Sequence, residues 1–391
     1  MIDRDISLNI NRTQVKRILF VITEDWYFMS HRLFLAKYAI SQGYEVSLLT
    51  KISIHKEEIE SYGIHLFDWP ISRRSTNIFT ELKSLLTLLK VIQKFKPNII
   101  HSVALKPILY GGICAKICKI PVRVFAFAGL GYVFSSSQFS AKTFQPIIIL
   151  VMRFLLKNKF STLIMQNKDD QSIFLQKKIV LKSQICIIRG AGVDLKLFSV
   201  SKNLTQPPIV LLPARLLRDK GIEDFVRAAT ILKKDRFNAR FVIAGREDPS
   251  NPEAIDKATL KKWKNSNIIE LWGHIDDMAG ALKKSSIVCL PSFREGLPKA
   301  LLESASCGKP IVTYDVPGCR EVVTDKLNGF LVEFRNIVDL SNAIKKLLLN
   351  QSLRESMGNA GRELVKKYFS QEEIAKQTEL LWKSKLKALN Q

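Results

Sequence analysis

The sequence lacks several patterns that would assign it to other functional classes. Its six cysteines have neither C-x-x-C nor Cys/His spacing, so we predict no zinc site and expect buried thiols in a reducing compartment. Residues 1–17 contain no apolar core of a signal peptide. The longest apolar run, residues 146–156, is interrupted by Arg153 and is shorter than the roughly 20 residues that span a bilayer. These absences predict a cytoplasmic chain without a membrane-spanning helix.

The charge balance is strongly basic and uneven. The 391 residues carry a formal net charge of +24, and residues 71–160 contain fourteen Lys or Arg but only one acid, Glu81. Such a field favours a polyanionic partner, either a nucleic acid or an anionic membrane surface. Bases bind to aromatic or Arg platforms, whereas the cations here lie beside aliphatic runs, so we predict no nucleic-acid partner.

The hydrophobic pattern predicts an α/β protein with two domains. A hydrophobic content of 47% is typical of a folded chain, and the length allows two ordinary domains. Residues 16–23 form a predicted strand, 24–31 a loop, 32–42 a helix and 45–50 a second strand. A second strand and helix series begins at residue 209, after a polar linker over residues 189–208.

The most informative stretch is residues 288–313, which predicts a strand, a loop and a helix that begins near Pro298. The free N–H groups of such a helix can hold an anion or a polar ligand at residues 295–298. Glu295 and Glu303 are eight residues apart, and two carboxylates suit a hydroxyl-rich ligand such as a sugar or ribose. The alternative is a Glu295 that only favours the helix dipole and a solvated Glu303.

Cations are predicted at the same edge of the second sheet. Arg215 and Lys220 flank a turn that opens a helix, and such a pair fits a diphosphate. If the sheet is parallel, the loops that contain Gly245 and His274 fall on the same rim. Surface salt bridges are the alternative role for the two cations.

Two histidines in the first half are candidate acceptor-binding or catalytic residues. His31 is predicted to open a helix, where it could orient an acceptor hydroxyl. His101 is predicted at the end of a strand, on the side where α/β folds bind ligands. No G-x-G-x-x-G follows the first strand, so we predict no nicotinamide or flavin cofactor.

These motifs resemble a known family. Glu295-Gly296-Leu297-Pro298 with Glu303, and Arg215 with Lys220-Gly221, are similar to the E-x7-E and R-L-x-x-x-K-G patterns of retaining glycosyltransferases of the GT-B fold, glycosyltransferase family 4. The pattern of residues 27–37 is similar to that of the bacterial polysaccharide and lipid-linked oligosaccharide enzymes. One departure is Ala191, which stands where the family usually has Asn.

The resemblance implies two Rossmann-like parallel-sheet domains that face a cleft. Residues 1–190 would bind the acceptor, residues 191–370 would bind the donor, and residues 371–391 would form a helix that crosses back. It implies a hexosyl- or N-acetylhexosaminyltransferase that uses a UDP-sugar with retention of anomeric configuration. Glu295 would contact the donor sugar and Glu303 the ribose. We predict independence of metal, because Arg215 and Lys220 can replace a metal ion at the diphosphate.

The expected partners are a nucleotide-sugar donor, a saccharide acceptor linked to polyprenyl diphosphate and the anionic inner face of the cell membrane. Residues 142–159 are apolar with Lys and Arg at the edges, which is typical either of a buried helix or of a helix at the membrane surface. Together with the basic field, this favours membrane contact. A UDP-sugar epimerase of similar architecture is the alternative enzyme.

Overall fold

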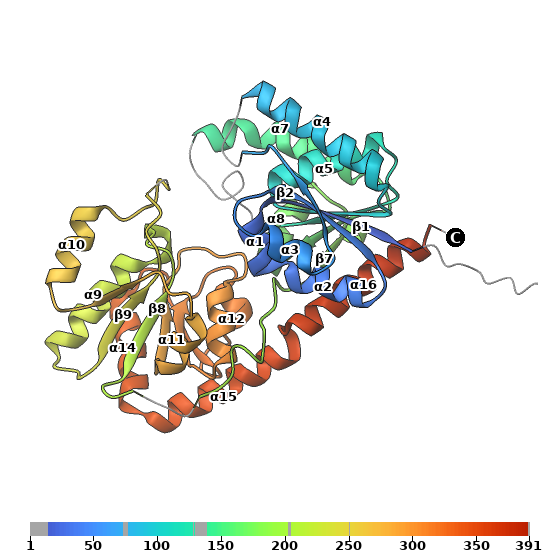
Figure 1. The fold of residues 1–391 in the computed structure, drawn as a ribbon. Coiled ribbons are helices and arrows are strands. Elements are labelled where there is room, and N and C mark those ends of the chain that lie inside the picture. The colour runs from blue at the N-terminus through green and yellow to red at the C-terminus, as the bar shows by residue number, and fades with distance from the viewer. Residues whose placement is uncertain are drawn as a thin grey trace, which may run out of the picture. The chain divides into compact units, whose positions relative to one another are not determined.

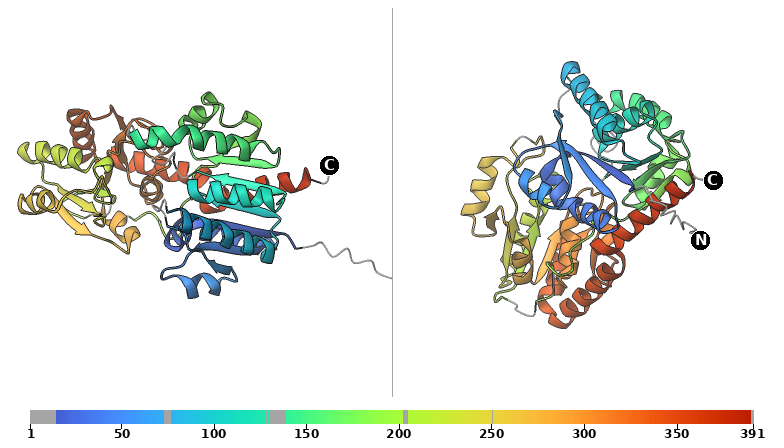
Figure 2. Two further views of the ribbon diagram at one scale, coloured as in Figure 1. Left: turned by 90° about the horizontal axis from the view of Figure 1, so that it is seen from above. Right: turned by 45° about the vertical axis from the view of Figure 1, so that its right-hand side comes forward.

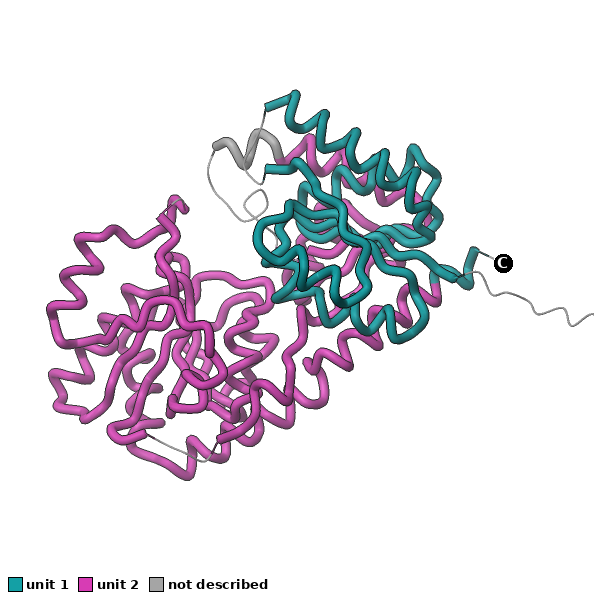
Figure 3. The backbone as a smooth tube through the Cα atoms, in the orientation of Figure 1, with its two compact units in different colours: residues 1–124, 385–391 teal, residues 125–384 magenta. Residues whose placement is uncertain are grey.

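The computed structural model describes residues 15–72, 77–127, 129, 139–201, 205–249 and 251–389, with side chains in the helix at 139–156 described from residue 145 onward. The chain divides into two compact units, Met1–Val124 with Lys385–Gln391, and Phe125–Ser384 (Figure 3). The last sheet strand before the linker ends at Ile187. The predicted boundaries at residues 190 and 370 stay predictions.

The first sheet has seven strands in the order β3-β2-β1-β4-β5-β6-β7. The strands are β1 Arg17–Glu24, β2 Glu45–Lys51, β3 His65–Asp68, β4 Ile99–Val103, β5 Val122–Ala126, β6 Ser161–Met165 and β7 Ile185–Ile187. The helices are α1 Asp25–His31, α2 Leu33–Ser41, α3 Lys56–Ser61, α4 Ile78–Phe95, α5 Leu105–Ile117, α7 Phe139–Leu156 and α8 Lys168–Gln176. β1 pairs in parallel with both β2 and β4.

The second sheet has six strands in the order β10-β9-β8-β11-β12-β13, and all its neighbours are parallel. Its neighbouring strands β8 and β9 are labelled in Figure 1. The strands are β8 Ile209–Pro213, β9 Arg240–Ala244, β10 Glu270–Gly273, β11 Ile287–Leu290, β12 Ile311–Tyr314 and β13 Gly329–Val332. The helices are α9 Ile222–Lys234, α10 Lys257–Asn265, α11 Met278–Lys284, α12 Lys299–Ser306, α13 Cys319–Val322, α14 Ile337–Leu349, α15 Gln351–Tyr368 and α16 Gln371–Lys387.

Apolar strands between helical layers explain why both sheets form. β4 and β8 are buried along their whole length, as expected for parallel strands covered on both faces (Figure 2). In each sheet the strand order reverses beside the first strand, between β1 and β4 and between β8 and β11. Ligands of such sheets bind beyond the carboxyl ends of the strands at this reversal. The predicted α/β fold with two parallel sheets is confirmed.

Three local predictions in the first half of the chain are wrong. The predicted loop over residues 24–31 is the helix α1, and its start is fixed by the buried Asp25, whose carboxylate accepts from the Ser53, Ile54 and His55 amides. His31 ends α1 and does not open a helix. His101 is the third residue of β4 and does not end a strand.

Helix α7 has buried and exposed apolar side chains, and membrane contact of residues 142–159 stays a prediction. Met152, Leu155 and Leu156 are buried, whereas Ile147, Leu150 and Phe154 are at least half exposed. No helix in the described parts of the chain is both long and apolar enough to cross a membrane.

Candidate active site

The loops that follow β8 and β11 meet at the strand-order reversal of the second sheet. The amide of Phe293, after β11, donates to the carbonyl of Asp219, after β8, at 2.8 Å. Gly221 has a φ of +69°, and a Cβ there would collide with the carbonyl of Pro291. Only glycine allows this close approach, which places the start of α9 beside the loop of the acidic motif.

Lys220 and Glu295 form the centre of the site. Lys220 Nζ lies 2.6 Å from Glu295 Oε1, and Ser292 Oγ donates to the same oxygen at 2.8 Å. Burial alone would lower the pKa of Lys220, but the adjacent Glu295 carboxylate raises it above its ordinary value. Lys220 therefore stays cationic at neutral pH, and the structure brings together the predicted cation and the predicted sugar-binding carboxylate.

Arg215 lies near this pair. Its Nη1 is 2.8 Å from Asp248 Oδ2, and its charge is close enough to oppose protonation of Lys220. The Arg215 side chain is 43% exposed, whereas that of Lys220 is 17% exposed. The two cations thus occupy one rim at different depths, which suits the two phosphates of a diphosphate.

Glu303 lies on the second turn of α12, and Pro298 is the residue before its first turn. Glu303 is 8% exposed, and its Oε1 lies 2.9 Å from Lys299 Nζ. Burial raises the pKa of Glu303 above its ordinary value, and the Lys299 charge opposes that rise only in part. A buried carboxylate with one cationic partner has lone pairs left for ligand hydroxyls, as the ribose role requires.

Glu303→Gln is expected to weaken UDP binding by about tenfold or more, because a charge-assisted hydrogen bond to a hydroxyl is lost. Because the pKa of Glu303 is raised in the folded protein, its protonated form stabilises the wild-type fold. This stabilisation is complete below the unfolded pKa of the carboxyl and is lost as the pH rises through the folded pKa. The stability of the Glu303→Gln variant should not show this pH-dependent decrease. Calorimetric UDP titration and unfolding temperatures from pH 4 to pH 8 test both effects, and unchanged UDP affinity would contradict the ribose role.

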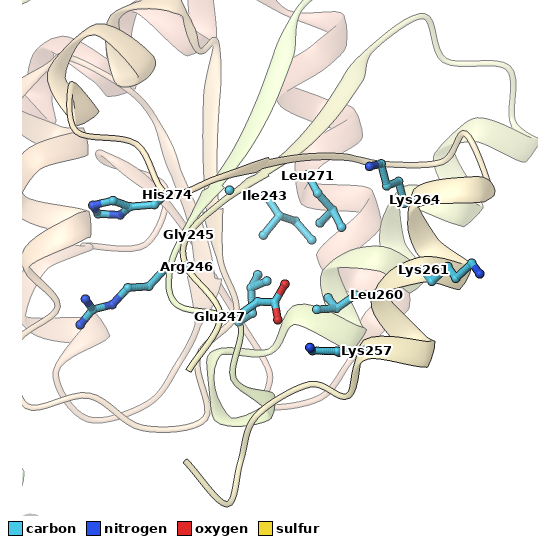
Figure 4. Close-up of a pocket in the computed structure, with 12 residues that line it drawn as sticks. Ile243, Gly245, Arg246, Glu247, Lys257, Leu260, Lys261, Lys264, Leu271 and His274 are labelled. Carbon is cyan, nitrogen blue, oxygen red and sulfur yellow. The ribbon is translucent and has the colours of Figure 1, made fainter. Parts of the chain in front are cut away.

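A pocket of about 670 Å³ opens on the same sheet beside β9 and β10 (Figure 4). Its apolar side chains are Leu216, Ile243, Leu260 and Leu271. The other residues of the lining are Gly245, Arg246, Glu247, Lys257, Lys261, Lys264, Gly273 and His274. A pocket that combines apolar side chains with polar groups is suited to a ligand such as a nucleotide base. Gly245 and His274 are thus brought together as predicted, and Arg246 and Lys257 were missed because isolated cations carry no sequence signal.

The loop of the acidic motif is also held from α8, within the same compact unit. Asn167 is fully buried, and its Nδ2 donates to the carbonyl of Gly296 at 2.7 Å. Arg294 Nη2 lies 2.7 Å from Asp170 Oδ1, and Asp170 is 2% exposed. Burial raises the pKa of Asp170, while Asn167 and Arg294 oppose the rise. These contacts fix the residues on both sides of Glu295.

Asn167→Ala is expected to lower turnover by about tenfold. The substitution removes the hydrogen bond to the Gly296 carbonyl, so the adjacent Glu295 is no longer held in position for the reaction. The matched control is Asn350→Ala, which removes the side-chain cap of α15 and should cost about 1 kcal/mol of stability without affecting turnover. Steady-state kinetics and thermal unfolding of both variants check this. If Asn167→Ala is less stable than the wild type but has the same turnover, Asn167 has only a structural role.

The two histidines lie in the first compact unit. His31 is half-buried, its ring stacks on Tyr27 with centroids 4.3 Å apart, and its Nδ1 lies 2.6 Å from Ser30 Oγ. His101 is 2% exposed and stacks on Phe20 at 5.2 Å. Burial, and then the nearby Arg32 charge, lower the pKa of His101 to about 3, so its imidazole is neutral. The catalytic role of His101 stays a prediction.

The described residues contain no group of three or more His, Cys, Asp or Glu side chains that could hold a metal ion. The six cysteines are free thiols, and four of them are buried. The predicted buried thiols are therefore confirmed for Cys114, Cys289, Cys307 and Cys319.

Two family models match the chain. The model described as glycosyl transferases group 1 matches residues 195–364, and the one described as glycosyl transferase 4-like matches residues 17–167. The 4-like model covers β1 to β6 of the first sheet, and the group 1 model covers all six strands of the second.

Curated relatives and solved structures agree with these models. The chain is 30% identical over 333 residues to the N,N'-diacetylbacillosaminyl-diphospho-undecaprenol alpha-1,3-N-acetylgalactosaminyltransferase of Campylobacter jejuni, covering 82% of this chain and 86% of that protein. It is 24% identical to the Escherichia coli UDP-Gal:alpha-D-GlcNAc-diphosphoundecaprenol alpha-1,3-galactosyltransferase, covering 83% and 85%. The sucrose-phosphate synthase of Thermosynechococcus elongatus has the same fold, with a TM-score of 0.79, 20% identity and coverage of 95% and 100%.

These relatives confirm the predicted enzyme class, a hexosyl- or N-acetylhexosaminyltransferase. The structural match confirms the predicted fold. With one model on each sheet and a 30% identical relative matched over most of its length, the chain belongs to the GT-B glycosyltransferases that carry the group 1 and 4-like domains.

Proposed function

We propose that this enzyme transfers a hexosyl or N-acetylhexosaminyl group from a UDP-sugar, with retention, to a saccharide acceptor on a polyprenyl diphosphate during cell-surface polysaccharide synthesis. The observation that carries the proposal is the Lys220–Glu295 contact, 2.6 Å long, at the strand-order reversal of the second sheet. The relatives from Campylobacter jejuni and Escherichia coli, whose names specify diphospho-undecaprenol acceptors, support the acceptor class.

In the proposed reaction the bond between the anomeric carbon and the diphosphate oxygen breaks, the acceptor oxygen forms the new bond to that carbon on the same face, and the hydroxyl proton passes to the departing diphosphate oxygen. Negative charge develops on the departing diphosphate. Arg215 and Lys220 lie where they can stabilise that charge, assisted by the amides at the start of α12. Glu295 would hold the sugar hydroxyls, and Glu303 the ribose. Metal independence is part of the proposal, because the two cations can take the role of a metal ion.

His31 remains the proposed acceptor-side residue, since it is half-buried at the end of α1 on the ligand-binding side of the first sheet. His101 is left without a contact to substrate because it is enclosed.

The test of this function is UDP release from a panel of UDP-sugars, with undecaprenyl-diphosphate-linked saccharides and chelator present. Transfer from one UDP-sugar in chelator is the expected result, and nuclear magnetic resonance of the product should show the anomeric configuration of the donor. Turnover that stops in chelator and returns with Mg²⁺ would contradict metal independence. Absence of transfer from every UDP-sugar would contradict the donor class.

We further propose that the enzyme works on an anionic membrane, at the cytoplasmic face. The exposed residues Ile147, Leu150 and Phe154 follow helical spacing on α7, beside the exposed Lys157 and Lys159. Apolar side chains that enter the interface next to cations at the headgroups are the arrangement that binds anionic lipid. In the first compact unit, α4 has a comparable exposed face, made of Ile78, Phe79, Leu82 and Leu86 with Lys83 and Lys90.

The double substitution Leu150→Glu with Phe154→Glu is expected to lower partitioning onto phosphatidylcholine vesicles that contain phosphatidylglycerol by about tenfold or more, because apolar burial is lost and two negative charges are added. Leu349→Glu, at an exposed position of α14, is the control and should bind as wild type does. Sedimentation with vesicles at low and high salt measures the effect. If the wild type binds equally well to vesicles that lack phosphatidylglycerol, the proposed attraction between its cations and anionic lipid is contradicted.

A further inference from the structure

Arg32 is a buried cation for which the described residues provide no carboxylate. It lies between α1 and α2 and is 5% exposed. Its Nη1 donates to the carbonyl of His31 at 2.9 Å, and its Nε is buried without a hydrogen-bond partner among the described residues. Burying a guanidinium without an opposite charge is costly, and such cost is usually offset by a ligand or a partner.

The buried carboxylate in the same region is not available to Arg32. Both oxygens of Asp25 accept hydrogen bonds elsewhere, from the Trp26 amide, from Ser53, and from the amides of Ile54 and His55. No ion pair joins Arg32 to any described acid. The positive charge of Arg32 nevertheless contributes to lowering the pKa of His101 on β4.

Arg32 also stands directly before the first turn of α2, a helix of nine residues. That turn contains no acidic residue and has no side-chain cap, while the amides of Leu35 and Ala36 donate to the Arg32 carbonyl. The positive end of the helix dipole favours an anion at this position. The helix start and the guanidinium therefore point to the same kind of ligand.

The position in the sheet agrees with a ligand site. α1 and α2 follow β1, and His101 lies on β4, so Arg32 is next to the strand-order reversal between β1 and β4. A crossover helix runs antiparallel to its strands, which puts its first turn on the side of their carboxyl ends. The second sheet has its cations after β8, at the equivalent reversal.

We propose that Arg32 and the first turn of α2 bind the diphosphate of the lipid-linked acceptor. The identity of the acceptor in this inference rests on the proposed function. The preference of the site for an anion is inferred from the buried charge of Arg32. A planar guanidinium can donate two parallel hydrogen bonds to a phosphate. The acceptor is thereby held by its diphosphate in the first unit, separately from the donor diphosphate at Arg215 and Lys220.

The first experiment titrates inorganic pyrophosphate into the full-length enzyme with the donor site saturated by UDP. The wild type should bind pyrophosphate, and Arg32→Met should weaken that binding by at least about tenfold. Lys37→Met, which removes an exposed cation of α2 that lies over the Tyr62 ring, should bind as wild type does. Lack of pyrophosphate binding by the wild type, or equal binding by Arg32→Met, would overturn the proposal.

Thermal unfolding separates this role from a packing role. Replacing an unpaired buried charge by an apolar side chain of similar length should leave the unfolding temperature unchanged or raise it. A lower unfolding temperature with unchanged pyrophosphate affinity would make Arg32 a packing residue. If Arg32→Met does not fold, Arg32→Lys takes its place, and it should still weaken pyrophosphate binding because it lacks the planar pair of donors.

The second experiment compares two acceptors that carry the same saccharide, one on farnesyl diphosphate and one as a methyl glycoside. Arg32→Met should raise KM at least about tenfold for the diphosphate acceptor and leave KM for the glycoside unchanged. An equal rise for both would overturn the diphosphate contact. The pyrophosphate titration does not require turnover. It therefore tests the Arg32 site even if the enzyme transfers sugar from no UDP-sugar, so failure of the proposed function can be distinguished from failure of this inference.

Discussion

Lys220→Met is expected to lower kcat/KM for the UDP-sugar on the order of 10²- to 10³-fold and to weaken UDP binding as well. Removing Lys220 takes away a cation at the departing diphosphate, and such a donor contributes mainly in the transition state. It also leaves Glu295 without its cationic partner, 2.6 Å away in the wild type. An uncompensated carboxylate at a phosphate site repels the donor, so the two effects act in the same direction.

The control for this variant is Lys326→Met, since the Lys326 side chain is 81% exposed. It removes one positive charge from the same unit without touching the site, and its kcat/KM should equal that of the wild type. Steady-state UDP release and calorimetric UDP titration measure both proteins. If Lys220→Met binds UDP as tightly as the wild type does, the cation does not contact the diphosphate.

Lys220 and Glu295 could be predicted from the sequence because they lie next to residues that mark the ends of strands and the starts of helices. The strand before Pro291, the helix after Pro298 and the turn at Gly221 each follow local rules, and together they place Lys220 beside Glu295. Parallel pairing of β8 with β11 then brings the two loops together. Local chemistry was therefore enough for these positions.

Other residues could not be found because their role depends on distant contacts. Asn167 lies 129 positions from Gly296, whose carbonyl it holds, and no periodicity in the sequence indicates that pairing. His101 was predicted as an accessible strand end, but β4 continues to Val103 and encloses its ring. The aromatic residues after β1 were assigned to a loop, although Asp25 accepts amide hydrogen bonds from the chain after β2 and starts a helix there.

Glu295→Gln is expected to lower kcat on the order of 10²-fold or more while UDP affinity is maintained or slightly increased. The amide keeps the size of the carboxylate and can still accept from Ser292. It no longer neutralises Lys220, so the charge offered to the UDP diphosphate increases. What is lost is the carboxylate that would grip the sugar hydroxyls as positive charge develops on the sugar in the transition state.

The control is Glu270→Gln, which removes a carboxylate paired with Arg240 at 2.6 Å, at the start of β10 and away from the carboxyl ends of the strands. It should leave kcat unchanged. Both the Lys220 and the Glu295 variants should lose turnover, but only the Lys220 variant should lose UDP affinity. A site in which Glu295 only held Lys220 in place would give parallel losses in both quantities, so the sign of the change in UDP affinity decides between direct sugar contact and a supporting role.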